Sequence, residues 1–251
     1  MKVFAFIAVL ITGLLLVVAA QSFPDWGDPG SPASRHVSSH YITEAEEETA
    51  VPNIVTAVLA DYRGFDTMFE TAVIFTAGIA VVLILRVFTR KRDDAPQEMA
   101  AELVYDDIIV RTIVRLLVPF LQLFALYVVM DGHHSPGGGF QGGFMLGASF
   151  IILAISFDLK TAMKRISERA VLLLAGAGVL IYAGIGFLSM LLGGNFLDYS
   201  ALSEILPNTD RVMARSHGML GIEIGVAVAV MAIMMLIFGN LASRGRMDKG
   251  L

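Results

Sequence analysis

Residues 170–192 read AVLLLAGAGVLIYAGIGFLSMLL and contain no charged side chain. An α-helix rises about 1.5 Å per residue and the hydrocarbon core of a bilayer is about 30 Å thick, so roughly 20 apolar residues cross it. Backbone groups in lipid must also find partners within the segment, which a helix provides. This stretch therefore predicts a transmembrane helix.

Five more apolar runs predict helices of the same kind, at 4–20, 68–85, 108–130, 144–157 and 218–238. The run at 144–157 is the shortest, and it reaches spanning length only if Phe140, Gly142 and Gly143 belong to the helix. The prediction is an all-α, multi-pass membrane protein with about six transmembrane helices.

The composition excludes several classes of function. Hydrophobic residues make up 56% of the chain and charged residues 16%, unlike a soluble domain. The chain has no cysteine, which excludes disulfides, thiolate chemistry and cysteine-bound metal centres. We therefore expect no catalytic residue, metal site or cofactor here, and any redox chemistry on partner chains. A net charge of −5 also argues against a nucleic-acid partner.

Lysine and arginine predict the orientation. With a cytoplasmic amino terminus, only Arg35, Arg63, Arg211 and Arg215 face outward, which leaves 14 of the 18 basic residues inside. This asymmetry follows the positive-inside rule and predicts a cell-membrane protein with both termini cytoplasmic. The first run, with Lys2 before it and small residues at its end, also resembles a cleaved signal peptide. That alternative stays open.

A charged stretch divides the predicted helices into two groups. Residues 1–92 form a two-span unit, 93–106 a cytoplasmic linker, and 107–251 a four-span unit. Within the first unit, prolines and an acidic cluster predict an irregular external segment at 21–50. Pro52 and the apolar spacing after it predict a short amphipathic helix that ends at Gly64.

The loop between the third and fourth spans, residues 131–143, reads DGHHSPGGGFQGG. Its Gly-x-Gly-x-x-Gly pattern lacks the preceding strand of a dinucleotide site. Glycines instead allow backbones to approach closely, so we expect a structural loop made of Pro136, Gly137, Gly138, Gly139, Phe140, Gly142 and Gly143. His133 and His134 can titrate near neutral pH, and three roles stay open: hydrogen bonds to carbonyl groups, a proton relay, or metal binding.

Acidic residues inside or beside the spans are the other candidates. Glu223 lies about 9 Å into the last predicted helix, where a carboxylate is costly unless it faces the bundle interior, a partner or water. An ion path and a structural hydrogen bond are both consistent with it. Glu70 begins the second span and is also a favourable charge at a helix start. Asp61 and Asp66 fit an interfacial charge network with Arg63, or an entry route for cations.

Four stretches, in two parts of the chain, resemble a known family of transporters. Residues 107–120, 132–143 and 221–226 (DIIVRTIVRLLVPF, GHHSPGGGFQGG and GIEIGV) resemble the B subunit of Mrp-type multisubunit Na+/H+ antiporters. Residues 53–70 (NIVTAVLADYRGFDTMFE) resemble the carboxy-terminal part of the large A subunit of the antiporter, or the small separate subunit of related membrane-bound hydrogenases. The arrangement departs from the usual antiporter, where the first unit is attached to the large A subunit.

The resemblance implies an accessory subunit of a Na+/H+ antiporter, related to the membrane arm of respiratory complex I. Its expected partners are other membrane subunits, Na+, H+ and the lipid bilayer. By motif, a cation path implied by the resemblance uses Glu70 and Glu223, with His133 and Pro136 organising the loop; Asp61 and Asp66 are further candidates. Two alternatives remain: a membrane subunit of a ferredoxin-driven hydrogenase or related respiratory complex, and a structural scaffold between antiporter modules.

Overall fold

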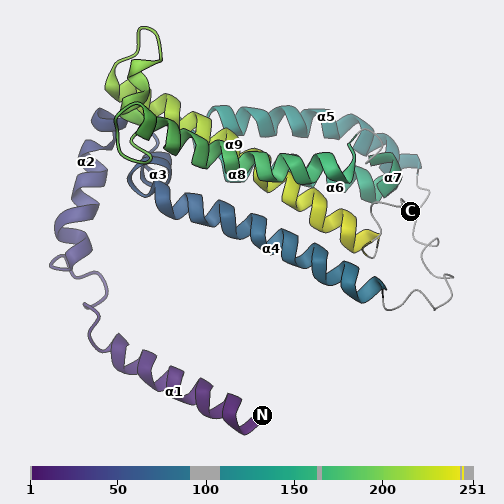
Figure 1. Cartoon of the computed structure of the whole chain (residues 1–251), viewed down its shortest axis with the longest axis horizontal. Coiled ribbons are helices and arrows are strands. Elements are labelled where there is room, and N and C mark those ends of the chain that lie inside the picture. The colour runs from purple at the N-terminus through teal and green to yellow at the C-terminus, as the bar shows by residue number, and fades with distance from the viewer. Residues whose placement is uncertain (1, 91–107, 163–165, 244, 246–251) are drawn as a thin grey trace. The chain divides into compact units, whose positions relative to one another are not determined.

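The computed structural model describes residues 2–90, 108–162, 166–243 and 245. All regular secondary structure in these ranges is helical, which confirms the predicted fold class. Six of the helices in them are long and apolar enough to cross a membrane (Figure 1): α1 (Lys2–Ala20), α4 (Gly64–Arg90), α5 (Ile108–Met130), α6 (Gly139–Ser156), α8 (Glu168–Leu191) and α9 (Arg211–Ala242). The predicted linker at 93–106 lies outside the described residues.

The chain forms two compact units, Met1–Glu44 and Ala45–Leu251. In the first unit, α1 buries none of its residues. The prediction of an irregular segment at 21–50 is wrong for residues 33–49, which form η1 (Ala33–Val37) and α2 (Ser38–Thr49). The prolines of this segment all lie before residue 33, and alanine and glutamate, which favour helix, are frequent after it.

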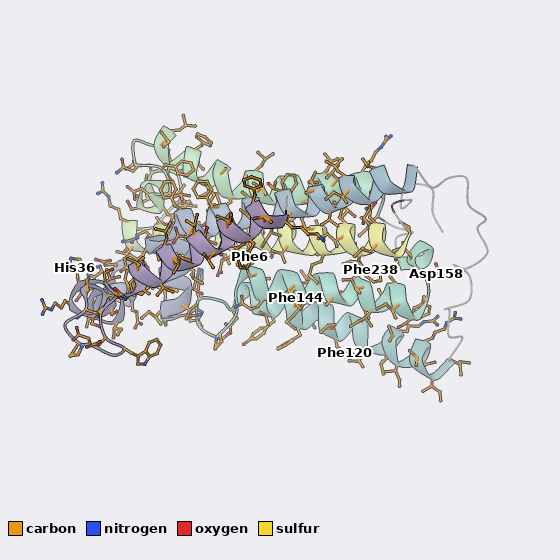
Figure 2. The ribbon with its side chains drawn as sticks, turned by 90° about the horizontal axis from the view of Figure 1, so that it is seen from below. Phe6, His36, Phe120, Phe144, Asp158 and Phe238 are labelled. Atoms are coloured by element: carbon orange, nitrogen blue, oxygen red, sulfur yellow. The ribbon has the colours of Figure 1, made fainter. Side chains whose placement is uncertain are left out.

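Helix α9 is the centre of the second unit. It packs against α8, α6 and α4 and against the short helix η3 (Tyr199–Glu204), and the ribbons of these helices run beside it in Figure 1. Its buried positions include many glycines and alanines, and small residues let membrane helices approach closely. Outward-facing aromatic side chains such as Phe120 and Phe144 stay exposed (Figure 2), as expected for surfaces that meet lipid or partner subunits.

Several helix ends differ from the predicted ones. Helix α9 begins seven residues earlier than expected, because the Asp210 side chain accepts a hydrogen bond from the Met213 amide and caps the helix. Helix α6 begins at Gly139, so Phe140, Gly142 and Gly143 belong to it, as spanning length requires. A short helix, α7 (Leu159–Ala162), follows it.

The predicted amphipathic helix before the second span is present but divided. It consists of α3 (Ile54–Thr56) and the π-helical η2 (Ala57–Tyr62). The sequence predicts that this helix ends at Gly64, but Gly64 is the first residue of α4. The Tyr182 hydroxyl donates a hydrogen bond to the Gly64 carbonyl, and a Cβ on Gly64 would lie 3.3 Å from the Tyr199 hydroxyl. Packing against α8 and η3 therefore sets this boundary.

Candidate functional site

Glu223 is a buried carboxylate in the interior of α9. The residue is 8% exposed, and its Oε2 atom is fully enclosed with no hydrogen-bond partner among the described residues. Because α9 begins at Arg211, Glu223 lies about 18 Å along the helix at about 1.5 Å per residue, deeper than the sequence indicated. A buried carboxylate without a close partner is costly, which makes this position a candidate for function.

Three glycines of the loop and of α6 make room for this side chain. A Cβ on Gly138 would lie 2.6 Å from Glu223 Oε1, and one on Gly132 would lie 3.2 Å from Oε2. A Cβ on Gly139 would lie 2.2 Å from the backbone oxygen of Glu223. Gly138 also has a φ of +114°, which only glycine adopts without strain. The glycine-rich loop thus forms one wall of the carboxylate site.

His133 is an ionisable residue that lies beside Glu223. Its Nε2 atom lies 3.8 Å from Glu223 Oε2, and its Nδ1 atom lies 3.2 Å from the Ser216 hydroxyl. The residue is 8% exposed, and Nε2 has no hydrogen-bond partner within the described part of the chain. Burial lowers the pKa of His133 and the charges of His134 and His217 lower it further, so the neutral imidazole is favoured.

Two residues that precede α4 hold this loop in place. The Asn53 side-chain amide donates to the carbonyl oxygens of Gly132 and Ser135, both at 2.8 Å. The Asn53 backbone N–H donates to the His133 carbonyl at 2.9 Å, and the Thr56 hydroxyl donates to the Gly132 carbonyl at 2.7 Å. Segments about 80 residues apart in sequence therefore fix the direction in which His133 points.

The other acidic candidates have different contacts. Asp61 accepts two hydrogen bonds from Arg215, from Nε at 2.8 Å and from Nη2 at 2.7 Å. Asp66 pairs with Arg63 on the surface, as expected of an interfacial charge network. Glu70 is exposed in the second turn of α4.

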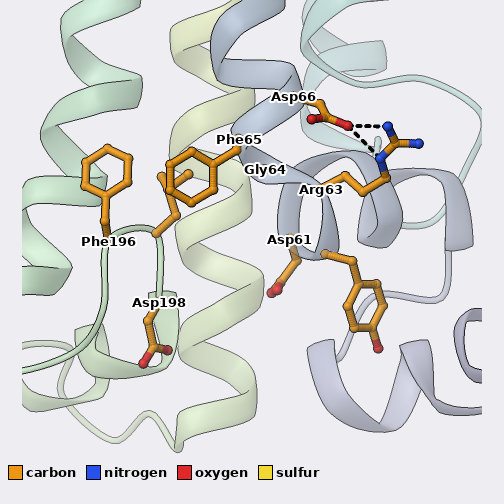
Figure 3. A pocket seen from close by; sticks show the side chains of 9 residues that line it. Asp61, Arg63, Gly64, Phe65, Asp66, Phe196 and Asp198 are labelled. Carbon is orange, nitrogen blue, oxygen red and sulfur yellow. Dashed lines mark hydrogen bonds and ion pairs between the residues drawn. The ribbon is translucent and has the colours of Figure 1, made fainter. Parts of the chain in front are cut away.

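A surface pocket of about 410 Å³ lies beside these charges (Figure 3). Asp61, Arg63 and Asp66 line one side of it and Phe196 and Asp198 line the other. The pairing of Asp61 and Asp66 with arginines neutralises much of the negative charge at its mouth.

Comparison with known proteins identifies the larger part of the chain. A family model described as a domain related to the MnhB subunit of Na+/H+ antiporters matches residues 109–236, just over half of the chain. The chain belongs to the MnhB-related family. A second family model, which describes the E subunit of MBH, matches residues 6–100. Together they confirm the two resemblances and the fused arrangement inferred from the sequence.

Curated relatives of the MnhB-related chain are antiporter subunits by name. The B subunit of the Na(+)/H(+) antiporter of Bacillus subtilis (strain 168) is 30% identical over 136 residues, which are 54% of this chain and 93% of that protein. A probable K(+)/H(+) antiporter protein of Rhizobium meliloti (strain 1021), named as a combined A/B subunit, is 26% identical over 193 residues. The match covers 70% of this chain and 19% of that longer protein.

Two solved structures share the fold over nearly the whole MnhB-related chain. The membrane-bound sulfane sulfur reductase, an archaeal respiratory membrane complex, has a chain with 27% identity and a TM-score of 0.59, covering 94% of this chain and 97% of that one. The Mrp complex from Dietzia sp. DQ12-45-1b has one with 27% identity and a TM-score of 0.62, covering 94% of this chain and 25% of that one.

The structure adds residues to the site that sequence reasoning did not single out. Ser216 contacts His133, Asn53 holds the loop, and Arg215 neutralises Asp61. Ser216 and Arg215 lie before the predicted start of the last helix, so helical spacing could not relate them to Glu223. A polar Asn53 before a predicted helix reads as an ordinary cap, a role it also has through the Val55 amide.

The remaining loop residues have packing contacts. A Cβ on Gly142 would lie 2.2 Å from Val129, and one on Gly143 would lie 2.6 Å from the Ala227 carbonyl oxygen. Gly137 lies against the Val128 carbonyl, Phe140 packs against the main apolar core, and Pro136 is exposed.

Proposed function

We propose that this chain is one component of a multisubunit Na+/H+ antiporter of the cell membrane, where it contributes part of an ion path. The buried carboxylate of Glu223 carries the proposal. Ionisable groups within membrane helices usually face a bundle interior or a water-filled path and often take part in ion movement. Membership of the MnhB-related family and the names of its relatives support exchange of a cation for a proton.

The proposal includes an orientation and an entry side. Basic residues predict that both termini are cytoplasmic, which puts the 131–138 loop and η2 on the outer side. On this side the exposed Glu70 would attract cations toward the membrane, whereas Asp61 and Asp66 are paired with arginines. The complete exchanger requires partner subunits, since the chain covers 19% of the A/B relative.

Glu223→Gln tests the proposal, because it removes the charge and keeps the shape. In everted membrane vesicles that contain the complex, we expect Na+-dependent dissipation of an imposed pH gradient to fall at least tenfold, while the subunits still co-purify. The matched control is Glu204→Gln, which changes an exposed glutamate of η3 and should leave exchange unchanged. Glu70→Gln tests the entry side in the same assay.

Three outcomes are separable. Lost exchange with an intact complex supports conduction, and loss of co-purification supports a scaffold role. Normal exchange in both Glu70→Gln and Glu223→Gln would overturn the assignment of these residues.

A second candidate function is a membrane component of a redox-driven respiratory complex. The specific observation is the sulfane sulfur reductase chain, which matches almost end to end, together with the match to the E subunit of MBH. The electron-transfer chemistry would then lie on partner chains. Vesicles energised only by an imposed pH gradient, without any electron donor, separate the two: exchange under these conditions supports the antiporter, and exchange that requires an electron donor supports the redox complex.

A further inference from the structure

Two enclosed polar atoms face each other at the centre of the candidate site. Glu223 Oε2 and His133 Nε2 are 3.8 Å apart, and neither has a hydrogen-bond partner among the residues that the structure describes. Buried polar atoms nearly always find partners, so an orphaned pair requires an explanation. Closing the gap by about 1 Å would make an ordinary hydrogen bond, provided that one proton lies between the two atoms.

The net charge of the Glu223–His133 pair depends on how many protons it holds. An ionised Glu223 beside a neutral His133 leaves a buried charge of −1. Adding one proton makes the pair neutral, either as the acid beside a neutral imidazole or as a carboxylate beside an imidazolium. A second proton would leave a buried charge of +1. Because a buried net charge is costly, the neutral pair is the most favourable of the three states. We call this state, in which the pair holds one added proton, the loaded pair.

The Ser216 hydroxyl suits both states, because it can donate or accept. When the loaded pair has a proton on His133 Nδ1, that N–H donates to the Ser216 oxygen at 3.2 Å. When the pair has released its proton, the Ser216 hydroxyl donates to Nδ1, which leaves the remaining N–H on Nε2 to face the carboxylate. The Ser216 hydroxyl therefore has only to rotate when the pair takes up or releases its proton.

The surroundings fit a proton better than a metal cation. Hard cations take several oxygen ligands, but glycine backbone forms the wall around the Glu223 carboxylate. The carbonyl oxygens of Gly132, His133 and Ser135 already accept hydrogen bonds from Asn53 and Thr56. No group of three or more acidic or histidine side chains that could hold a metal occurs in the described ranges.

We propose that Glu223 and His133 form a proton-binding site that takes up and releases one proton, with Ser216 as its hydrogen-bonding partner, and that Na+ does not bind there. This inference rests on the proposed function and specifies the ion handled at this position. Asn53 is a positioning residue, because it holds the loop that carries His133.

Infrared titration of the purified complex tests this directly. In the wild type we expect one carboxyl group whose protonated signal disappears as the pH rises, and Glu223→Gln should remove that signal. His133→Gln should shift its midpoint by about one pH unit or more, as for two coupled groups. Raising the Na+ concentration should leave the wild-type midpoint unchanged.

Substitutions of Ser216 provide a gentler variant of the same test. Ser216→Ala should move the midpoint, and Ser216→Thr, which keeps the hydroxyl, should restore it.

Three results would each overturn the inference. They are a carboxyl signal that persists in Glu223→Gln, an unchanged midpoint in His133→Gln, and a wild-type midpoint that falls as the Na+ concentration rises. The last result would show that Na+ competes for the site.

The two proposals can fail separately, because the infrared signal requires no transport. Absence of cation/proton exchange in wild-type vesicles with a normal titration would overturn the proposed function and leave the proton site standing. Exchange that depends on Glu223, combined with a midpoint that moves with the Na+ concentration, would support the proposed function and overturn the proton site.

Discussion

Arg215 holds Asp61 in a two-point ion pair at one end of the bundle. The side chains are 24% and 10% exposed, so the carboxylate of Asp61 has little access to water. Arg215→Ala leaves this charge without its partner, and we expect a loss of about 2–3 kcal/mol, below the range for fully buried pairs because Arg215 is partly solvated. Thermal unfolding of the purified complex measures it.

The surface pair of Arg63 with Asp66 is the matched control for that loss. Its side chains are 61% and 49% exposed, and exposed ion pairs contribute at most about 1 kcal/mol. Arg63→Ala should therefore change the melting temperature much less than Arg215→Ala. Equal effects would contradict the view that burial gives the Asp61 pair its importance.

His133 predicts a dependence of stability on pH. Its pKa is lower in the folded protein than the ordinary histidine value of about 6.5, so the unfolded chain binds the proton more readily. The stability contribution of neutral His133 is then complete above about pH 6.5 and is lost as the pH falls toward the folded-state pKa.

Melting temperatures of the complex at neutral and mildly acidic pH check this sign. We expect a smaller acid-induced decrease in His133→Gln than in the wild type. His36→Gln, which changes an exposed histidine, should leave the decrease unchanged. A larger decrease in His133→Gln would mean that a protonated His133 stabilises the fold, for example by pairing with Glu223.

Among the helices, α8 and α9 meet through a close backbone contact at Gly178. A Cβ on Gly178 would lie 2.4 Å from the Gly225 carbonyl oxygen and 2.6 Å from the Ala229 amide nitrogen. Gly178→Ala should push the helices apart and destabilise the protein by about 1–3 kcal/mol, a typical cost of overpacking. Gly176→Ala, where a Cβ would meet nothing within 4 Å, is the control on the same helix and should be neutral. Thermal unfolding compares the two variants.

At the level of the whole molecule, helix α4 belongs to the first predicted unit and packs against helices of the second. It contacts α9 and α8, and the Arg86 side chain pairs with Glu168 at the start of α8. In Bacillus subtilis the matching B subunit is a protein of its own, of which 93% aligns with this chain. We therefore predict that the two units of this chain associate even when the predicted linker between them is cut.

Dividing the chain within residues 93–106 tests this. The two co-expressed pieces should co-purify through an affinity tag on one of them and retain exchange activity in vesicles. Adding Asn53→Ala and Arg86→Ala to the divided protein should reduce co-purification, because Asn53 donates hydrogen bonds to the 131–138 loop and Arg86 pairs with Glu168. If the divided wild-type pieces do not associate, the two-unit interpretation is wrong.

The six spanning helices and the fused family relationship could be predicted from the sequence. Both depend on features that are local along the chain. The length of an apolar run determines whether the segment can cross a bilayer. A continuous motif such as residues 131–143 can be recognised from its residue order alone, without knowledge of its contacts in the fold. The positions of helix ends that depend on capping and packing are predicted less accurately from the sequence. The start of α9 after its Asp210 cap and the boundary at Gly64 are two examples.

The tertiary structure alone decided which of the acidic residues shares a site with a histidine. The sequence offers four acidic candidates, and Glu223 is the one of these four that lies beside His133. Their proximity depends on Asn53, about 80 residues before the loop, and on Ser216 of α9. Contacts between segments so far apart are set by how the helices pack. The sequence therefore identifies Glu223 as a carboxylate that is costly to bury in a membrane helix, and the fold determines that His133 lies beside it.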